Sequence, residues 1–214
     1  SEFIAVVGGN GAGKTTLVQA IAGVIVPPRR AVRIDGRDVA RLGARELTER
    51  VGFVFQNPEH QFIAATVAAE LAHGLRRRGL DDDAVRARTA EVLDRFGLSE
   101  KAESHPFLLS GGQKRRVDLA LGLVGDPELI FLDEPTTGFD PAARRQSWDV
   151  VREFTRLGKT VLLTTHYMDE AEHLADRVAV IVGGRLIEVG TPREIGGRAR
   201  DVAHLDLEEE PIEL

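Results

Sequence analysis

Near its start the chain reads Gly8-Gly9-Asn10-Gly11-Ala12-Gly13-Lys14-Thr15-Thr16. The apolar run Phe3–Val7 precedes it and the helix-like stretch Leu17–Ala22 follows it, so the order is strand, glycine-rich loop, helix. Glycines let the backbone curl until successive N–H groups converge on phosphate oxygens, and the helix start adds free N–H groups and a positive dipole end. In this setting we expect Lys14 to reach the β- and γ-phosphates of a nucleoside triphosphate and Thr15 to hold Mg²⁺. The alternative is an ordinary glycine turn, and the flanking strand and helix argue against it.

The composition limits the classes of protein that the chain can belong to. It has 214 residues, is 43% hydrophobic and carries a net charge of -6, which argues against a nucleic-acid-binding surface, since that needs a basic face. The sequence contains no cysteine, so disulfides and thiolate metal sites are excluded. It shows neither a signal peptide nor an apolar run as long as a membrane span, which favours a soluble cytoplasmic protein. Because the only methionine is Met168, we expect a fragment that lacks part of its N-terminal segment.

Strand-like and helix-like runs alternate, which predicts an α/β fold with a mainly parallel central sheet. The strand-like runs are Phe3–Val7, Ala31–Asp35, Val51–Phe55, Leu129–Asp133, Thr160–Thr164, Val178–Val182 and Arg185–Val189. Gly183-Gly184 between the last two runs is a hairpin signal, so we expect an antiparallel piece there.

A helical pattern replaces the strand signal in the middle of the chain. Asp81-Asp82-Asp83 is typical of a helix start and Gly97 of a helix end, with apolar residues on one face between them. We therefore predict three regions. They are an α/β core of residues 1–57 and 118–196, a helical subdomain of residues 58–117, and a solvated tail of residues 197–214.

A second motif, Leu129–Glu134, is a buried-strand pattern that ends in two carboxylates. The C-terminal end of a parallel core strand lies beside the phosphate loop, so Asp133 is expected to bind Mg²⁺ together with Thr15. Glu134, one residue later, is placed to act as the general base for a water that attacks the γ-phosphate. The alternative, in which Asp133-Glu134-Pro135 only caps a turn, is equally good for the motif alone and weaker beside the glycine-rich loop.

A third motif, Leu109-Ser110-Gly111-Gly112-Gln113-Lys114, precedes a helix-like pattern. Ser110 can cap that helix, and the apolar residues Val117, Ala120, Leu121 and Val124 continue it with helical spacing. Glycines just past a serine cap create a second helix start that can bind an anion.

In order and spacing, these motifs resemble the nucleotide-binding domain of ABC transporters, from about Phe3 to Ile195. Gln56 and His166 match that family as well. The resemblance implies a P-loop NTPase with a RecA-like core, which binds ATP and Mg²⁺ and hydrolyses ATP. It also implies a head-to-tail dimer in which each ATP lies between the P-loop of one domain and Ser110–Gln113 of the other.

The resemblance also implies roles for single residues. Gln56 would touch Mg²⁺ and the attacking water, His166 would contact the γ-phosphate, and Asp140 would communicate across the dimer. The implied catalytic residues are Glu134, His166 and Gln56, and the implied metal-binding residues are Thr15, Gln56 and Asp133. The implied nucleotide-binding residues are Gly8, Asn10, Gly11, Ala12, Gly13, Lys14, Thr15 and Thr16, together with Ser110, Gly111, Gly112, Gln113 and Asp140. The aromatic residue on which the family stacks adenine would lie upstream of the P-loop, in the segment that we expect to be missing.

The residues around Gln56 indicate the type of transporter. Val54–Phe62, Thr66–Leu71 and His105-Pro106-Phe107 are similar to ATPases of energy-coupling-factor importers, a class that includes cobalt, nickel and vitamin systems. This implies an integral membrane subunit that docks near Glu59–Phe62, and a location on the cytoplasmic face of the cell membrane.

Two alternatives remain open. Thr165–Glu172 resembles ATPases of multidrug and polysaccharide exporters. ABC ATPases that act on ribosomes or DNA are the second alternative, and the acidic charge and short helical insertion fit them poorly.

Overall fold

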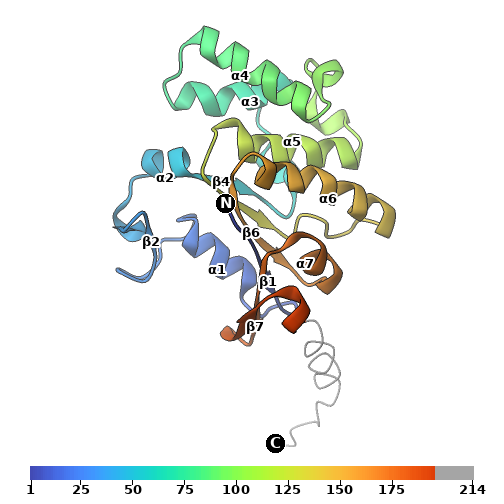
Figure 1. The fold of residues 1–214 in the computed structure, drawn as a ribbon. Helices are drawn as coiled ribbons and strands as arrows, with labels where there is room; N and C mark the ends of the chain where they lie inside the picture. Colours follow the sequence, from blue (N-terminus) through green and yellow to red (C-terminus); the bar gives the residue numbers. More distant parts are fainter. Residues whose placement is uncertain (196–214) are drawn as a thin grey trace, which may run out of the picture.

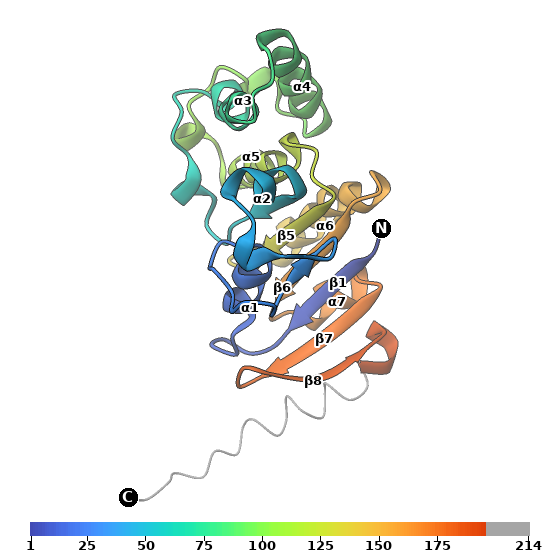
Figure 2. The same cartoon turned by 90° about the vertical axis from the view of Figure 1, so that its left-hand side faces the viewer.

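The central sheet has the strand order β4-β5-β6-β1-β7-β8 in the computed structural model, which describes residues 1–195. Its strands are Val51–Val54 (β4), Leu129–Asp133 (β5), Thr160–Thr165 (β6), Phe3–Val7 (β1), Arg177–Val182 (β7) and Arg185–Gly190 (β8). Neighbouring strands from β4 to β7 are parallel, and β8 pairs antiparallel with β7. The first strand of the chain thus lies between strands of the C-terminal third (Figure 2).

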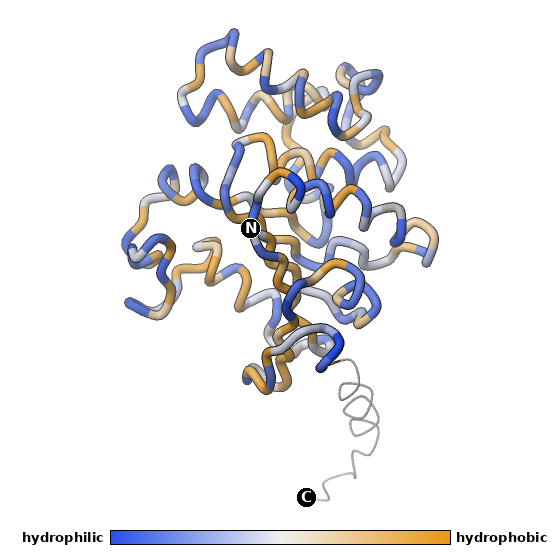
Figure 3. The backbone as a smooth tube through the Cα atoms, viewed as in Figure 1, coloured by the Kyte–Doolittle hydropathy of each residue, from blue (hydrophilic) through white to orange (hydrophobic). Residues whose placement is uncertain are grey.

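Helices cover both faces of the sheet. Helix α1 (Lys14–Ile21) lies on one face, and α6 (Pro141–Arg156) and α7 (Met168–Leu174) lie on the other (Figure 2). Inner strand β5 is buried on both faces: Phe131 packs with residues of α1, whereas Ile130 and Leu132 join the larger core on the opposite side. Figure 3 shows apolar residues gathered along these central strands.

A helical region stands at one end of the sheet (Figure 1). It consists of α3 (Val67–Arg77), α4 (Asp82–Arg95) and α5 (Gly111–Val124), joined through the 3-10 turns Pro58–Gln61 (η2), Ser99–Lys101 (η3) and Pro106–Leu108 (η4). As the sequence predicts, Asp81 caps α4 by accepting a hydrogen bond from the N–H of Ala84 at 2.8 Å, and the helix ends just before Gly97. Helix α5 continues without a break through the predicted boundary between residues 117 and 118.

The strand predicted over Ala31–Asp35 is shorter in the structure and lies outside the central sheet. Only Arg33–Ile34 (β2) is extended, and it pairs with Arg37–Asp38 (β3) in a separate two-stranded sheet. The turn residues Asp35 and Gly36 have φ angles of 49° and 74°, so this Asp-Gly pair is a hairpin signal that the sequence reading missed. A 3-10 turn, Val39–Arg41 (η1), and helix α2 (Ala44–Arg50) lead from it into β4.

The other hairpin is confirmed. Gly183 and Gly184 have φ angles of 53° and 75° and join the antiparallel pair β7 and β8. The predicted tail, residues 197–214, lies outside the described residues. Within residues 1–195, no helix has the length and apolar character needed to cross a membrane.

Candidate active site

The glycine-rich loop between β1 and α1 depends on its glycines. Gly11 and Gly13 have φ angles of 78° and 95°, in the left-handed region that side chains disfavour. A Cβ atom on Gly8 would lie 2.3 Å from the carbonyl oxygen of Ile181, so the loop can pass β7 only with glycine there. The loop thus reaches the start of α1 with backbone N–H groups available to an anion.

Lys14 opens α1 and folds back over this loop. Its side chain is almost fully buried, and Nζ donates to the carbonyl oxygens of Gly8 at 2.9 Å and Gly9 at 3.0 Å. Nζ also lies 3.2 Å from Oε1 of Glu134. A buried ammonium beside free backbone N–H groups makes the loop a site for phosphate.

Asp133 ends β5 next to α1. Its Oδ1 accepts hydrogen bonds from the hydroxyls of Thr15 at 3.0 Å and Thr164 at 2.6 Å. A carboxylate and a hydroxyl at the edge of the phosphate loop are the hard oxygen ligands that Mg²⁺ takes, so these residues fit that ion.

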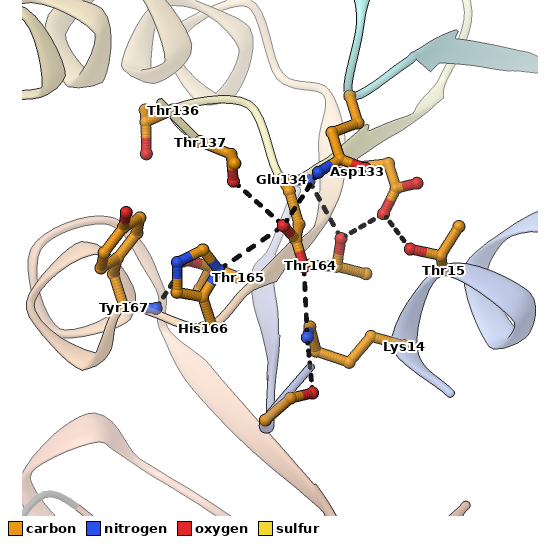
Figure 4. A network of polar contacts seen from close by, with 12 residues as sticks. Lys14, Thr15, Asp133, Glu134, Thr136, Thr137, Thr164, Thr165, His166 and Tyr167 are labelled. Atoms are coloured by element: carbon orange, nitrogen blue, oxygen red, sulfur yellow. Dashed lines mark hydrogen bonds and ion pairs between the residues drawn. The ribbon is translucent and has the colours of Figure 1, made fainter. Parts of the chain in front are cut away.

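Glu134 is the centre of the polar network (Figure 4). Its Oε2 accepts hydrogen bonds from Gln56 Nε2 at 3.3 Å and Thr137 Oγ1 at 3.0 Å, and it lies 3.5 Å from Nδ1 of His166. Its φ angle of 45° is unusual for a residue with a side chain, and hydrogen bonds from its N–H to Thr164 hold it there. Three segments far apart in sequence, which carry Lys14, Gln56 and His166, thus converge on one carboxylate.

These groups line one cavity of about 470 Å³. Its lining residues are Asn10, Gly11, Gly13, Lys14, Thr15, Thr16, Gln56, Glu134, Thr137 and His166. Gly8 and Ala12 belong to the loop without lining the cavity. Asp133 sits just behind it, through Thr15. Thr137 was not predicted, and its position three residues after Glu134 is the signal that could have found it.

Residues Ser110–Gln113, which we call the signature segment, lie elsewhere. Ser110 and Gln113 form a capping box at the start of α5, with the Ser110 N–H donating to Gln113 Oε1 at 3.0 Å and the Gln113 N–H to Ser110 Oγ at 3.3 Å. Ser110, Gly112 and Gln113 line a second cavity of about 280 Å³, and Gly111 lines a third. Among the described residues, the signature segment does not line the P-loop cavity.

Asp140 is exposed and caps α6. Its Oδ1 accepts from the N–H groups of Ala142 at 2.8 Å and Ala143 at 3.0 Å. The hydrogen bonds from Ala143 and Ala142 lower the pKa of the Asp140 carboxyl below its usual value. The carboxylate therefore stays ionised and fixes the start of the helix.

Comparisons with known proteins agree with this site. The ABC transporter family matches residues 1–137. The energy-coupling factor transporter ATP-binding protein EcfA1 of Symbiobacterium thermophilum is 44% identical over 212 residues, which cover 98% of this chain and 74% of that protein. EcfA1 of Lacticaseibacillus paracasei is 40% identical over 97% of this chain and 74% of its own length.

Two solved structures are also similar. CbiO1 of Clostridium perfringens, part of the ABC transporter complex cbiONQ, has a TM-score of 0.83 and 33% identity over 97% of this chain and 84% of its own. The dimeric ATP-binding cassette MJ0796, in a post-hydrolysis state bound to ADP and Pi, has a TM-score of 0.77 and 27% identity over 90% of this chain and 86% of its own.

The chain belongs to the ABC transporter family. It is an ATPase domain of that family with the P-loop NTPase fold, so the predicted family, fold class and type of enzyme are confirmed.

Proposed function

We propose that this chain binds ATP with Mg²⁺ and hydrolyses it to power an energy-coupling-factor importer of a metal ion or vitamin. The observation that carries the proposal is the position of Glu134. Its carboxylate lies in the P-loop cavity, between Lys14 on one side and Gln56, Thr137 and His166 on the other.

In this proposal, different residues bind the phosphates, hold Mg²⁺ and accept the proton. Lys14 exchanges the carbonyl oxygens of Gly8 and Gly9 for phosphate oxygens, and this exchange also frees Glu134 from its ion pair. Thr15 and Asp133 would hold Mg²⁺, which supplies charge neutralisation at the phosphates when bound. Glu134 then accepts a proton from the attacking water, while Gln56 and His166 orient the groups around it.

A second ATPase domain completes the site in this proposal. The signature segment does not line the P-loop cavity of its own chain, so a head-to-tail partner would supply it. The dimeric structure of the MJ0796 cassette supports the association of two such domains. The γ-phosphate carries the charge that attracts both domains, so ATP closes the dimer and hydrolysis opens it.

The membrane partner is proposed to dock near Glu59–Phe62, which would place the chain on the cytoplasmic face of the cell membrane. Phe62 is buried against Phe107, whereas Ile63 next to it is 70% exposed and available to a partner. The names of the EcfA1 relatives support the importer type over the exporter alternative. Purification of the chain from its native membranes tests this: an integral importer subunit supports the proposal, and an exporter permease or ribosomal partners contradict it.

The substitution Glu134→Gln tests the chemistry. It keeps the shape of the side chain and removes the base, so kcat should fall by about 10²–10⁴-fold and ATP should accumulate in a stable dimer. ATPase assays and size-exclusion chromatography with MgATP measure the two effects. Glu172→Gln, on the exposed side of α7, is the matched control and should keep wild-type turnover. If Glu134→Gln hydrolyses ATP at the wild-type rate, Glu134 is not the base.

A further inference from the structure

Glu170 is a buried carboxylate on α7, four residues after His166. It is only 1% exposed, and its Oε1 accepts hydrogen bonds from Thr136 Oγ1 at 2.9 Å and from Trp148 Nε1 at 3.2 Å. Burial of a carboxylate is costly, and two hydrogen bonds only partly offset that cost. Glu170 does not line the P-loop cavity, so nucleotide binding does not explain it.

The two residues that donate hydrogen bonds to Glu170 belong to different parts of the fold. Thr136 lies two residues after Glu134, in the turn that carries the proposed base. Trp148 is on α6, the helix that Asp140 caps. Trp148 is buried, and its indole N–H donates a hydrogen bond that connects α6 to Glu170. One carboxylate therefore joins the Glu134 turn, α6 and the segment that begins at His166.

A second contact links α6 to the same segment. The guanidinium carbon of Arg144 lies 3.5 Å from the centre of the Tyr167 ring, and Nη1 of Arg144 lies 3.4 Å from Oδ2 of Asp169. The Tyr167 ring in turn lies beside the His166 ring, with 3.9 Å between their centres (Figure 4). The position of His166 thus depends on how α7 packs against α6.

Arg115 on α5, the helix that begins at the signature segment, interacts electrostatically with Glu170. Burial lowers the pKa of Arg115 on α5, and the negative charges of Asp118, Glu170 and Asp133 oppose this effect. Burial likewise raises the pKa of Glu170, while the hydrogen bonds from Thr136 and Trp148 and the charge of Arg144 oppose it. Glu170 therefore lies within electrostatic reach of α5 as well.

We propose that Glu170 is a positioning residue, which holds the Glu134 turn and the His166 segment in one arrangement relative to α6. This inference rests on the proposed function, because it concerns the alignment of Glu134, the proposed base, with His166. Replacing Glu170 should affect the transition state more than the binding of ATP, since Glu170 does not line the P-loop cavity.

Steady-state ATPase assays on Glu170→Ala and Glu170→Gln test the proposal. Glu170→Ala should lower kcat about tenfold and change the KM for ATP by less than about twofold. Glu170→Gln keeps a carbonyl oxygen that can accept both hydrogen bonds, so it should recover kcat to within about threefold of wild type. The exposed Glu172→Ala on the same helix is the control, and its kcat should be unchanged.

If Glu170→Ala does not fold, as judged by its thermal unfolding, Thr136→Val decides the question. It removes one donor with little change of shape, and kcat should fall about threefold at unchanged KM. Wild-type kcat in the folded Glu170→Ala, or in Thr136→Val when Glu170→Ala is unfolded, would overturn the proposal. An equal loss of kcat in Glu172→Ala would also overturn it. So would a result in which Glu170→Ala raises the KM for ATP and leaves kcat unchanged. Absence of ATPase activity in the wild-type chain would instead refute the proposed function.

Discussion

At the scale of single residues, the backbone of Glu134 matters as much as its carboxylate. A left-handed conformation at a non-glycine residue costs on the order of 1–3 kcal/mol, and hydrogen bonds to Thr164 hold it in place. The side chain that this residue carries ends beside Lys14, with 3.2 Å between Oε1 and Nζ. Strain at this position is thus linked to the placement of the proposed base.

Thr15 allows a test of the proposed Mg²⁺ site. Replacing Thr15 with Val removes the hydroxyl that donates to Asp133, so the affinity for MgATP should fall about tenfold. The affinity for ATP measured with EDTA should change little, because Lys14 and the loop remain. Isothermal titration calorimetry with and without Mg²⁺ separates the two affinities. The exposed Thr48→Val is the control, and equal losses with and without Mg²⁺ would argue against a metal-binding role for Thr15.

At the scale of secondary-structure elements, α5 connects the signature segment to the core through a buried ion pair. Arg115 donates to Asp118 and, at 2.7 Å, to the carbonyl oxygen of Phe55, and Gln61 also donates to Asp118. The carbonyl of Phe55 immediately precedes Gln56. The start of α5 is thereby tied to the segment that leads out of the P-loop cavity.

This pair predicts a pH dependence of stability. Burial raises the pKa of Asp118 to about 7, although Arg115 opposes the rise. An acid whose pKa is higher in the folded state binds more protons there, so its contribution to stability is lost as the pH rises toward 7. The free energy of unfolding, measured by urea denaturation, should fall between pH 5 and pH 8 more steeply in wild type than in Asp118→Asn. The exposed Asp94→Asn should keep the wild-type slope, and parallel slopes in all three proteins would contradict the prediction.

A comparison of two helix caps distinguishes an effect on stability from an effect on ATP hydrolysis. Ser110 caps α5 and Asp81 caps α4, and replacing either with Ala should cost about 1 kcal/mol in the free energy of unfolding. Only Ser110→Ala should also lose ATP hydrolysis, because only that cap belongs to the signature segment. Denaturation curves and ATPase assays on both variants measure this. Full activity in Ser110→Ala would show that its cap is structural alone.

At the scale of the whole molecule, each proposed ATP site needs two chains. Lys14→Ala removes the ammonium group of the P-loop, and Ser110→Ala removes the cap of the signature segment. Either variant alone should therefore be inactive. In a head-to-tail dimer, a mixed pair keeps one site with an intact P-loop and an intact signature segment. An equal mixture should therefore recover up to about a quarter of wild-type activity, because about half of the dimers are mixed and each has one good site.

This complementation has a direct control. Lys14→Ala mixed with Glu134→Gln should remain inactive, since both substitutions affect the same half of the site. If the mixture of Lys14→Ala and Ser110→Ala also stays inactive while the two chains associate, the head-to-tail arrangement is wrong.

The features of this chain that could be predicted from residue types alone are local ones. The P-loop, the caps at Asp81 and Ser110 and the Gly183-Gly184 hairpin each depend on residues within a few positions of one another. Backbone geometry and hydrogen bonding over so short a span are set by residue type, so spacing alone is enough to predict them. The family resemblance extended this reading to Gln56 and His166, although nothing local places them near Glu134.

Which of these segments meet depends on contacts between residues far apart in the chain. The strand order puts β1 between β6 and β7, and long-range packing then brings Lys14, Gln56 and His166 onto the Glu134 carboxylate. The left-handed backbone of Glu134 and the burial of Glu170 belong to the same class of features. Each is unfavourable in isolation and persists only because distant elements supply its hydrogen bonds and exclude water.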